Sequence, residues 1–310
     1  MKKILRFLKW TGLVFGSILI TVSILTASRQ NLKFEAPYPE IRASRDTAVI
    51  ARGKHLVNAV AHCMDCHSRT NGDSLLDIDI DVPLSGSVAF KLPVGIIYSA
   101  NITSDPVYGI GRYDDGQIAR VLRYGVHPDG TAVYDFMPFH NLSDEDLTAV
   151  ISYLRTQKPI PLRKQENELN AIGNMVKAFL VKPIGPSENI EQKVQKDSSA
   201  TYGKYLVMNV ANCSGCHTKR SISGEFTGAL LAGGNPMGGG HIPPNLTQDS
   251  SSRIFGWTEQ IFVNRFRMGK IYPDSEMPWN SFKRMDDIEL KAIYKFLQTI
   301  RPVKTAGSKS

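Results

Sequence analysis

The sequence predicts an all-α protein made of two consecutive, similar modules behind an N-terminal membrane helix. Three observations lead to this prediction. The pentad Cys63–His67 recurs as Cys213–His217, other short motifs recur at nearly the same offset, and a long uncharged stretch lies near the N-terminus. Motifs that recur in the same order along one chain indicate a duplicated fold. With 310 residues, 42% of them hydrophobic, the chain is long enough for about two domains with hydrophobic cores.

The two pentads share the spacing Cys-x-x-Cys-His and contain all 4 cysteines of the chain. Two thiols at this spacing can each add to a vinyl group of one porphyrin, and the histidine that follows then supplies the proximal nitrogen to the iron. The alternatives are structural zinc or two local disulfides. A zinc site would need further thiols or paired histidines at finger spacing, which neither half offers. The residues predicted to bind two covalent haem c groups are Cys63, Cys66, His67, Cys213, Cys216 and His217.

The charge pattern gives no sign of nucleic acid as a partner. The formal net charge is +8, but the basic residues are scattered and are not interleaved with aromatic residues as in a nucleic-acid groove. The propionates of two haems would offset about half of this charge. The remaining positive surface is either simply solvated or faces anionic lipid or an acidic partner.

An uncharged stretch of 18 residues, from Trp10 to Ala27, predicts a membrane anchor. A helix of this length spans about 27 Å, close to the hydrocarbon thickness of a bilayer. Four basic residues precede it: Lys2, Lys3, Arg6 and Lys9. This flank should stay in the cytoplasm, which makes the chain a single-pass protein of the inner membrane with its haem motifs on the periplasmic side. The alternative is a cleaved signal peptide, for which the small residues at 26 to 28 offer a site.

Further motifs repeat at offsets close to the 150 residues that separate the pentads. They are Gly53–Val57 with Gly203–Val207 at 150, Asn101–Asp105 with Asn245–Asp249 at 144, Phe136–Phe139 with Glu276–Trp279 at 140, and Leu147–Leu154 with Leu290–Leu297 at 143. Since the offset changes only between motifs, we expect loop insertions within one common fold. The Asn-x-Thr-x-Asp element is predicted either to stabilise a loop through its own side chains or to lie at the haem edge.

Three helices are predicted in each half from apolar periodicity, cap residues and following glycines. They are 47–60, 114–124 and 143–154 in the first half, and 200–210, 258–268 and 286–297 in the second. The expected division is a transmembrane anchor or signal at 1–28, a tether at 29–45, a first module at 46–158, a linker at 159–199, a second module at 200–303 and a basic tail at 304–310. Within the linker, Ala171 to Val181 either packs across the module interface or forms one short surface helix.

The second axial ligand decides whether a haem passes electrons or binds a small molecule. The candidates are Met137, His127 and His140 in the first half, and Met237, Met268, Met277, Met285 and His241 in the second. The duplication aligns only Met137 with Met277, and both precede a proline, which favours a loop at the methionine. We therefore predict Met137 and Met277 as the distal iron ligands, with the histidines and a core-packing methionine as alternatives. A thioether ligand would raise the reduction potential relative to two histidines.

The chain resembles the membrane-associated cytochrome c subunits of periplasmic quinoprotein and flavoprotein dehydrogenases, such as those that oxidise alcohols, gluconate or sorbitol. The resemblance rests on the pentads, the repeated Asn-x-Thr-x-Asp elements and the Met-Pro pairs, and it covers Asp46 to Pro302. It implies two tandem class I cytochrome c modules, with an N-terminal anchor helix here. That family usually has three haem modules, and this chain has two.

Two functional hypotheses follow. In the first, the protein is an electron carrier and no enzyme by itself: a periplasmic or membrane dehydrogenase reduces it, and a terminal oxidase or soluble cytochrome of the respiratory chain accepts the electrons. In the second, it is a dihaem enzyme, such as a peroxidase or a sulfur-compound oxidoreductase, with one open or switchable haem. The matched methionines favour the carrier.

Overall fold

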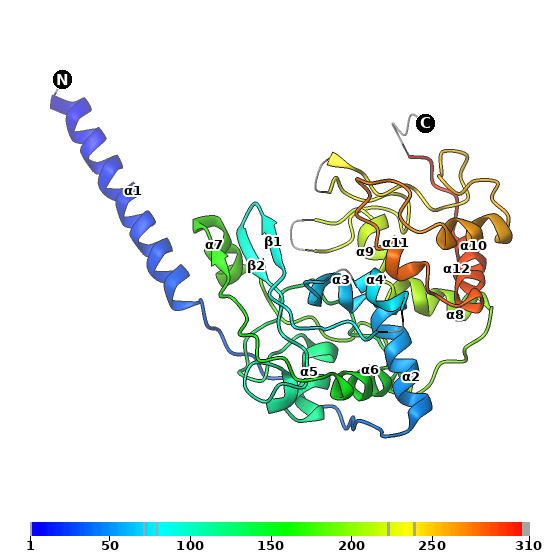
Figure 1. Cartoon of the computed structure of the whole chain (residues 1–310). Helices are drawn as coiled ribbons and strands as arrows, with labels where there is room; N and C mark the ends of the chain where they lie inside the picture. Colours follow the sequence, from blue (N-terminus) through cyan, green and yellow to red (C-terminus); the bar gives the residue numbers. More distant parts are fainter. Residues whose placement is uncertain (1, 71, 79, 222–223, 238–239, 306–310) are drawn as a thin grey trace.

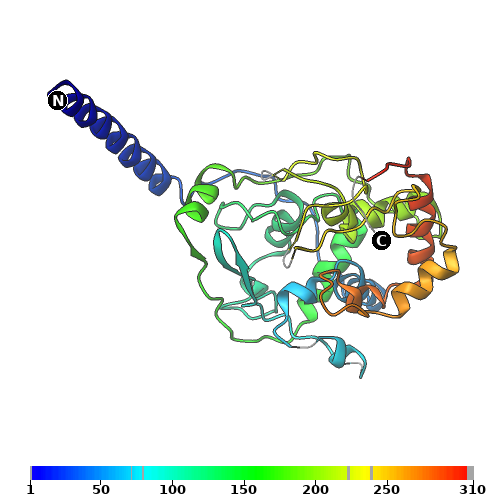
Figure 2. The ribbon, with the colours of Figure 1, turned by 90° about the horizontal axis from the view of Figure 1, so that it is seen from above.

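The computed structural model describes residues 2–70, 72–78, 80–221, 224–237 and 240–305. Helix α1 (Lys2–Ser28) projects away from a helical body that contains the other elements, as Figures 1 and 2 show from two directions. It has no buried residue, and within the described part of the chain it is the one helix long and apolar enough to cross a membrane. An apolar N-terminal helix, as predicted, is therefore present.

The two halves of the body share five helical elements in the same order, and each half has short helices of its own. The first half contains α2 (Thr47–His55), the π-helical turn η1 (Leu56–Val60), α3 (Cys63–His67), α4 (Gly72–Leu76), the 3-10 turn η2 (Ile110–Arg112), α5 (Asp115–Tyr124) and α6 (Asp144–Thr156). The second contains α8 (Ala200–Tyr205), the π-helical turn η3 (Leu206–Val210), α9 (Cys213–His217), α10 (Glu259–Arg267), α11 (Trp279–Phe282) and α12 (Asp287–Thr299). The shared pairs are α2/α8, η1/η3, α3/α9, α5/α10 and α6/α12. The predicted helices are confirmed, except that the first of each half changes from α to π geometry midway.

Corresponding helices also pack in the same way. Helix α2 crosses α6, and α8 crosses α12. At each crossing the backbones meet at a glycine: a Cβ on Gly53 would lie 1.9 Å from the carbonyl oxygen of Ala149, and one on Gly203 would lie 1.9 Å from that of Ala292. Only glycine permits this close approach. Both halves therefore depend on the same contact between their first and last helices.

The helix ends follow the local signals in the sequence. Asp114 and Thr258 cap α5 and α10 by accepting hydrogen bonds from backbone amides of the first turn. Gly125 and Gly269 follow these helices with φ of 61° and 63°, the left-handed backbone that commonly ends a helix. Ser143 caps α6 in the same manner.

A small antiparallel sheet departs from the predicted all-α fold. Strands β1 (Ala89–Leu92), β2 (Gly95–Tyr98) and β3 (Glu168–Leu169) form it in the order β1-β2-β3. The second half has only isolated bridges among its described residues. The reason is chain length: the repeat offset falls from 150 to 144 here, so the first half is six residues longer between pentad and Asn-x-Thr element. The protein is thus mostly helical with little sheet.

The segments outside the repeats also differ in how they pack. The tether runs along the first half, where the guanidinium of Arg120 donates to the carbonyls of Phe34 and Ala36. Helix α7 (Ala171–Phe179) contacts α1 and β3, so the short surface helix is the alternative that the structure supports. Residues 306–310 of the predicted tail lie outside the described residues.

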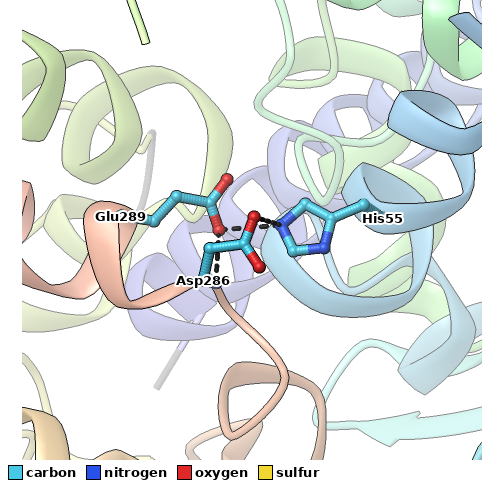
Figure 3. Close-up of side chains that lie close together, drawn as sticks. All are labelled: His55, Asp286 and Glu289. Carbon is cyan, nitrogen blue, oxygen red and sulfur yellow. Dashed lines mark hydrogen bonds and ion pairs between the residues drawn. The ribbon is translucent and has the colours of Figure 1, made fainter. Parts of the chain in front are cut away.

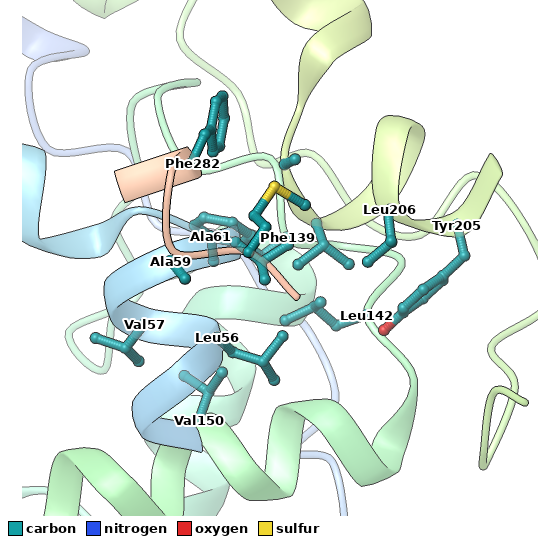
Figure 4. Packing of buried hydrophobic residues seen from close by; sticks show 14 of the residues in the cluster. Leu56, Val57, Ala59, Ala61, Phe139, Leu142, Val150, Tyr205, Leu206 and Phe282 are labelled. Atoms are coloured by element: carbon teal, nitrogen blue, oxygen red, sulfur yellow. The ribbon is translucent and has the colours of Figure 1, made fainter. Parts of the chain in front are cut away.

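One hydrophobic core connects the two halves. Its buried residues form a single cluster that includes the first and last helices of both halves. Figure 4 shows Phe139 and Leu142 of the first half beside Leu206, Tyr205 and Phe282 of the second. The halves are therefore held together by apolar burial as well as by the chain.

Candidate haem-attachment sites

The two pentads fold into single helical turns, α3 and α9, directly after the π-helical turns. The residue before each turn has left-handed backbone, with φ of 42° at His62 and 52° at Asn212. Histidine and asparagine belong to the few side chains that occur there with some frequency. The same unusual conformation in both halves indicates that the two turns are built alike.

The four thiols are unpaired, and three of them are at least partly buried. The exception is Cys216, which is exposed. Burial raises the pKa of Cys63 and of Cys213 to about 12, and that of Cys66 to about 11. A zinc site needs thiolates, so the raised pKa values disfavour the zinc alternative. The unpaired sulfurs give no support to the alternative of two local disulfides.

Each pentad histidine is oriented by one hydrogen bond. The Nδ1 of His67 lies 2.8 Å from the carbonyl oxygen of Ala100, and the Nδ1 of His217 lies 2.7 Å from that of Pro244. A carbonyl only accepts, so Nδ1 carries the proton and Nε2 keeps its lone pair. Burial lowers the pKa of both imidazoles, which favours the neutral form. A neutral histidine with its other nitrogen bonded to a carbonyl has the usual arrangement of a metal ligand.

The repeated Asn-x-Thr-x-Asp elements hold these carbonyls in place. The Oδ1 atoms of Asn101 and Asn245 accept hydrogen bonds from the backbone amide two residues later, at 3.0 and 2.8 Å. Their Nδ2 atoms donate to Ile160 and Val303, in the segments after the last helix of each half, at 2.8 and 2.7 Å. The loop-stabilising interpretation is confirmed. The structure adds that the residue just before each asparagine provides the carbonyl that lies within hydrogen-bond distance of the pentad histidine.

Met137 and Met277 occupy equivalent loops. Both are partly buried against the hydrophobic core, as are the first cysteines of the two pentads. The carbonyl of each methionine accepts a hydrogen bond from the amide two residues later, Phe139 at 2.9 Å and Trp279 at 2.7 Å. The alignment of Met137 with Met277 in the sequence therefore extends to the backbone hydrogen bonds of the two loops.

The other candidate ligands in the second half are placed differently. Met268 and Met237 are 61% and 37% exposed, whereas Met285 is 1% exposed and lies in the core. His241 is exposed. Met285 thus has the packing role that the sequence left open, and the remaining three lie towards solvent.

His140 is a stronger rival in the first half. Both of its ring nitrogens are buried and make no hydrogen bond of normal geometry to a described residue. Burial lowers the pKa of this imidazole as well. Buried polar atoms without partners are rare in folded proteins, and a metal is one explanation for them. The ring of His127, in contrast, is half-buried in the loop before Asp129.

A buried charge network joins the halves, and the sequence analysis missed it. Arg52 of α2 lies 3.0 Å from Asp146 of α6 and 2.9 Å from Glu289 of α12, and it donates to the Tyr202 hydroxyl at 3.1 Å. The two carboxylate side chains are 0% and 3% exposed. Burial would lower the pKa of Arg52, but the two acids outweigh it and raise that pKa. One cation thus compensates acids from both halves.

The same network has an approximate twofold relation. His55 of α2 lies 2.7 Å from Glu289 of the other half, and Tyr205 of α8 donates to Asp146 of the other half at 3.0 Å. His55 and Tyr205 are equivalent positions, as are Asp146 and Glu289. The sequence did contain a signal of this interface: the aligned positions 52/202, 55/205 and 146/289 all have polar, charged or tyrosine side chains on helices that are otherwise expected to pack in the core.

Figure 3 shows His55, Asp286 and Glu289 converging from α2 and the start of α12. Their ligand atoms lie within 4.8 Å of one another, a spacing that would suit a metal ion. However, the oxygens of Glu289 accept hydrogen bonds from Arg52 and from the Asp286 amide. Since protein donors already satisfy these oxygens, we interpret the group as an interface rather than a metal site.

The first pentad turn, α3, and the residue before it contact helix α11, which follows Met277. His62 packs edge-on against Phe282 with 5.4 Å between ring centroids, and Asp65 accepts from the Ser281 hydroxyl at 2.8 Å. Ser281 and Phe282 follow Met277 by four and five residues. The helix that follows the candidate distal methionine of the second half therefore lies against the candidate haem turn of the first.

A weaker contact runs in the opposite direction. Asn141, four residues after Met137, donates to the side chain of Asn209 in η3 at 3.4 Å. Turn η3 leads directly into the second attachment turn. Residues that follow each candidate distal methionine thus contact the region of the pentad in the other half.

No protein-family model matches the chain. The chain is similar to cytochrome c subunits of alcohol, fructose and gluconate dehydrogenases. It is 29% identical to the cytochrome c subunit of a quinone alcohol dehydrogenase of Gluconobacter oxydans (strain 621H), over 83% of this chain and 56% of the relative. It is 28% identical to the fructose dehydrogenase cytochrome subunit of Gluconobacter japonicus, over 94% of this chain and 60% of the relative.

A diheme cytochrome c-type of Cereibacter sphaeroides is 27% identical over 67% of this chain and 70% of its own length. The chain spans less than two thirds of the length of the dehydrogenase subunits it matches. The resemblance that the motifs indicated is therefore confirmed at the level of cytochrome c subunits of dehydrogenases, and electron transfer by covalent haem c is supported in general.

Proposed function

We propose that this protein transfers electrons through two haem c groups, one bound to each half. The thioether residues are Cys63 and Cys66 in the first half and Cys213 and Cys216 in the second. The observation that carries the proposal is the repeated hydrogen bond from histidine Nδ1 to a carbonyl, at 2.8 and 2.7 Å. This bond leaves the Nε2 atoms of His67 and His217 as proximal iron ligands. Haem c supplies a one-electron iron couple when bound.

The distal ligands in this proposal are Met137 and Met277. Their loops have the same backbone hydrogen bond and the same partial burial. A protein ligand on both faces keeps small molecules from the iron, which suits electron transfer. Each methionine would also keep its iron low-spin in both oxidation states.

The two halves are proposed to transfer electrons between their haems as one rigid unit. His62 and Asp65 contact helix α11, which follows Met277, so the first pentad turn lies close to the proposed distal side of the second half. The shared core and the network around Arg52 hold this arrangement in place. Electrons that enter at one haem can then leave at the other without movement of the halves.

The proposed location is the periplasmic face of the inner membrane, with α1 as a single-pass anchor. The support is the exposed apolar helix and its basic N-terminal flank. The proposed donor is a periplasmic or membrane dehydrogenase, because the relatives are named as cytochrome subunits of alcohol, fructose and gluconate dehydrogenases and because α1 would hold this chain at the membrane. The proposed acceptor is a terminal oxidase or a soluble cytochrome.

The test is electron paramagnetic resonance of the oxidised protein together with the near-infrared methionine-to-iron charge-transfer band. We expect two low-spin haems, both with the methionine signature. A high-spin haem at rest would overturn the carrier proposal and favour a dihaem peroxidase or sulfur-compound oxidoreductase. Copurification of a tagged full-length chain with a dehydrogenase, whose substrate then reduces the haems, tests the donor separately.

A further inference from the structure

Helix α7 turns its apolar side outwards. The exposed fractions are 64% at Ile172, 45% at Met175, 37% at Phe179 and 48% at Leu180. At about 100° per residue these positions form one continuous stripe along the helix. The stripe is a single apolar surface, in contrast to the scattered exposed residues that any soluble protein has.

The small and polar side of α7 faces the protein. Gly173 and Ala178 are buried, and a Cβ on Gly173 would lie 2.0 Å from the carbonyl oxygen of Val94 in the β1-β2 turn. The Asn174 side chain donates to backbone carbonyls at the start of the helix. A helix on a watery surface is expected to have the reverse orientation, with its apolar side inwards. We therefore expect the exposed apolar side of α7 to be buried against something other than water.

The position of α7 next to the end of α1 indicates what buries this apolar side. Arg29 donates to the carbonyl of Ala178 at 3.0 Å, and its guanidinium lies 5.2 Å from the centre of the Phe179 ring. Gln30 donates to the carbonyl of Asn174 at 3.0 Å. Both residues directly follow the last residue of α1, and Figure 1 shows α7 beside this end of α1. If α1 crosses a bilayer, the uncharged stretch ends at Ala27, so α7 lies at the level of the headgroups.

We propose that α7 is a second membrane contact, whose apolar stripe enters the boundary between headgroups and acyl chains next to α1. A helix in this position buries its apolar face by roughly 5 to 10 Å. Lys182, just beyond the helix, is exposed and suits anionic headgroups. The inference rests on the proposed anchoring by α1. Its consequence is that two contacts, one spanning and one lying flat, set the orientation of the haem-binding body relative to the membrane.

The experiment measures the depth of a spin label at Met175→Cys in the haem-loaded full-length protein, reconstituted in vesicles of equal parts phosphatidylcholine and phosphatidylglycerol. Power saturation compares access of oxygen, which concentrates in lipid, with access of a water-soluble nickel chelate. The matched control is Ile261→Cys on α10, since Ile261 is 48% exposed and Met175 is 45% exposed. We expect an oxygen-to-nickel ratio several-fold higher at 175 than at 261.

A double variant provides the second measurement. Ile172→Glu with Phe179→Glu puts two charges on the stripe, so the label at 175 should move into water while the protein still floats with the vesicles. Equal water access at 175 and 261 in a floating protein would overturn the α7 inference and leave the anchor intact. Lipid access at both positions would also overturn it. Failure to float would overturn both membrane proposals, whereas the haem spectra test electron transfer independently.

Discussion

The two halves of this protein agree where they would touch a cofactor and differ where they face each other or the surroundings. The attachment turn, its left-handed preceding residue, the histidine hydrogen bond and the asparagine that supports it have the same geometry in both. The sheet and α7 have no counterpart in the described residues of the second half. The comparison teaches that duplicated chemistry needs fixed local geometry, while the remaining surface is free to take other roles.

The interface between the halves shows how equivalent positions acquire different roles. Arg52 and Tyr202 are equivalent, yet one carries charge and the other a hydroxyl. Two arginines here would leave excess positive charge, and two tyrosines would leave Lys196 as the partner of Asp146 and His55 as the partner of Glu289. The asymmetric pair neutralises part of the acid charge and satisfies the remaining oxygens by hydrogen bonds.

The largest expected effect separates the two attachment sites. Replacing Cys63 and Cys66 by alanine, or Cys213 and Cys216, should halve the covalent haem per polypeptide, because each pair of thioether bonds holds one group. The pyridine haemochrome assay measures this content. Met64→Ser makes the first pentad more like the second and keeps both thiols, so it should retain all the haem. Unchanged content in either cysteine variant would refute the attachment sites.

The second prediction concerns the distal side, where His140 aligns on Asn280. Met137→Ala and Met277→Ala should each remove about half of the near-infrared methionine band and open one iron to carbon monoxide, since each removes one ligand. His140→Asn, which copies the second half, should leave the band and the carbon monoxide response unchanged. If His140→Asn opened the iron and Met137→Ala did not, the distal ligand of the first half would be His140.

The third prediction breaks the interface. Arg52→Met should lower the free energy of unfolding by about 3 kcal/mol, because it removes the cation that the two buried acids share and leaves only Lys196 at 3.5 Å from Asp146 and His55 at 2.7 Å from Glu289. Urea titration monitored by far-ultraviolet circular dichroism measures the change. Lys204→Met removes an ion pair whose side chains are 57% and 53% exposed, so it should cost less than about 0.5 kcal/mol. Equal effects of the two variants would argue against a buried network.

The smallest expected effect is a change in pH dependence. Burial would raise the pKa of Glu289, but the hydrogen bond from His55 and the charges of His55 and Arg52 lower it from 4.5 to about 2. A carboxylate with a depressed folded pKa stabilises the fold above its unfolded pKa, and this contribution disappears as the pH falls towards the folded value. Glu289→Gln should therefore flatten the decline of the melting temperature between pH 4.5 and 2. Parallel curves for the two proteins would contradict the assignment.

The sequence by itself determined the features that depend on neighbours along the chain. The pentads depend on a spacing of two residues, the caps of α5 and α10 on the residues beside each helix, and the apolar length of α1 on composition alone. Repetition added the pairing of Met137 with Met277. These features were predictable because helix formation, capping and thioether spacing all act over a few residues.

Tertiary structure decided everything that joins distant segments. The carbonyl that orients His67 lies 33 residues away, and the carboxylate that pairs with His55 lies 234 residues away. The β1-β2 hairpin and β3, which add to the predicted all-α fold, depend on the segments against which they lie. The orientation of α7, with its apolar side towards the outside, depends in the same way on α1 and the hairpin. Local periodicity shows that a helix has an apolar side, but only packing against the rest of the molecule decides which way that side faces.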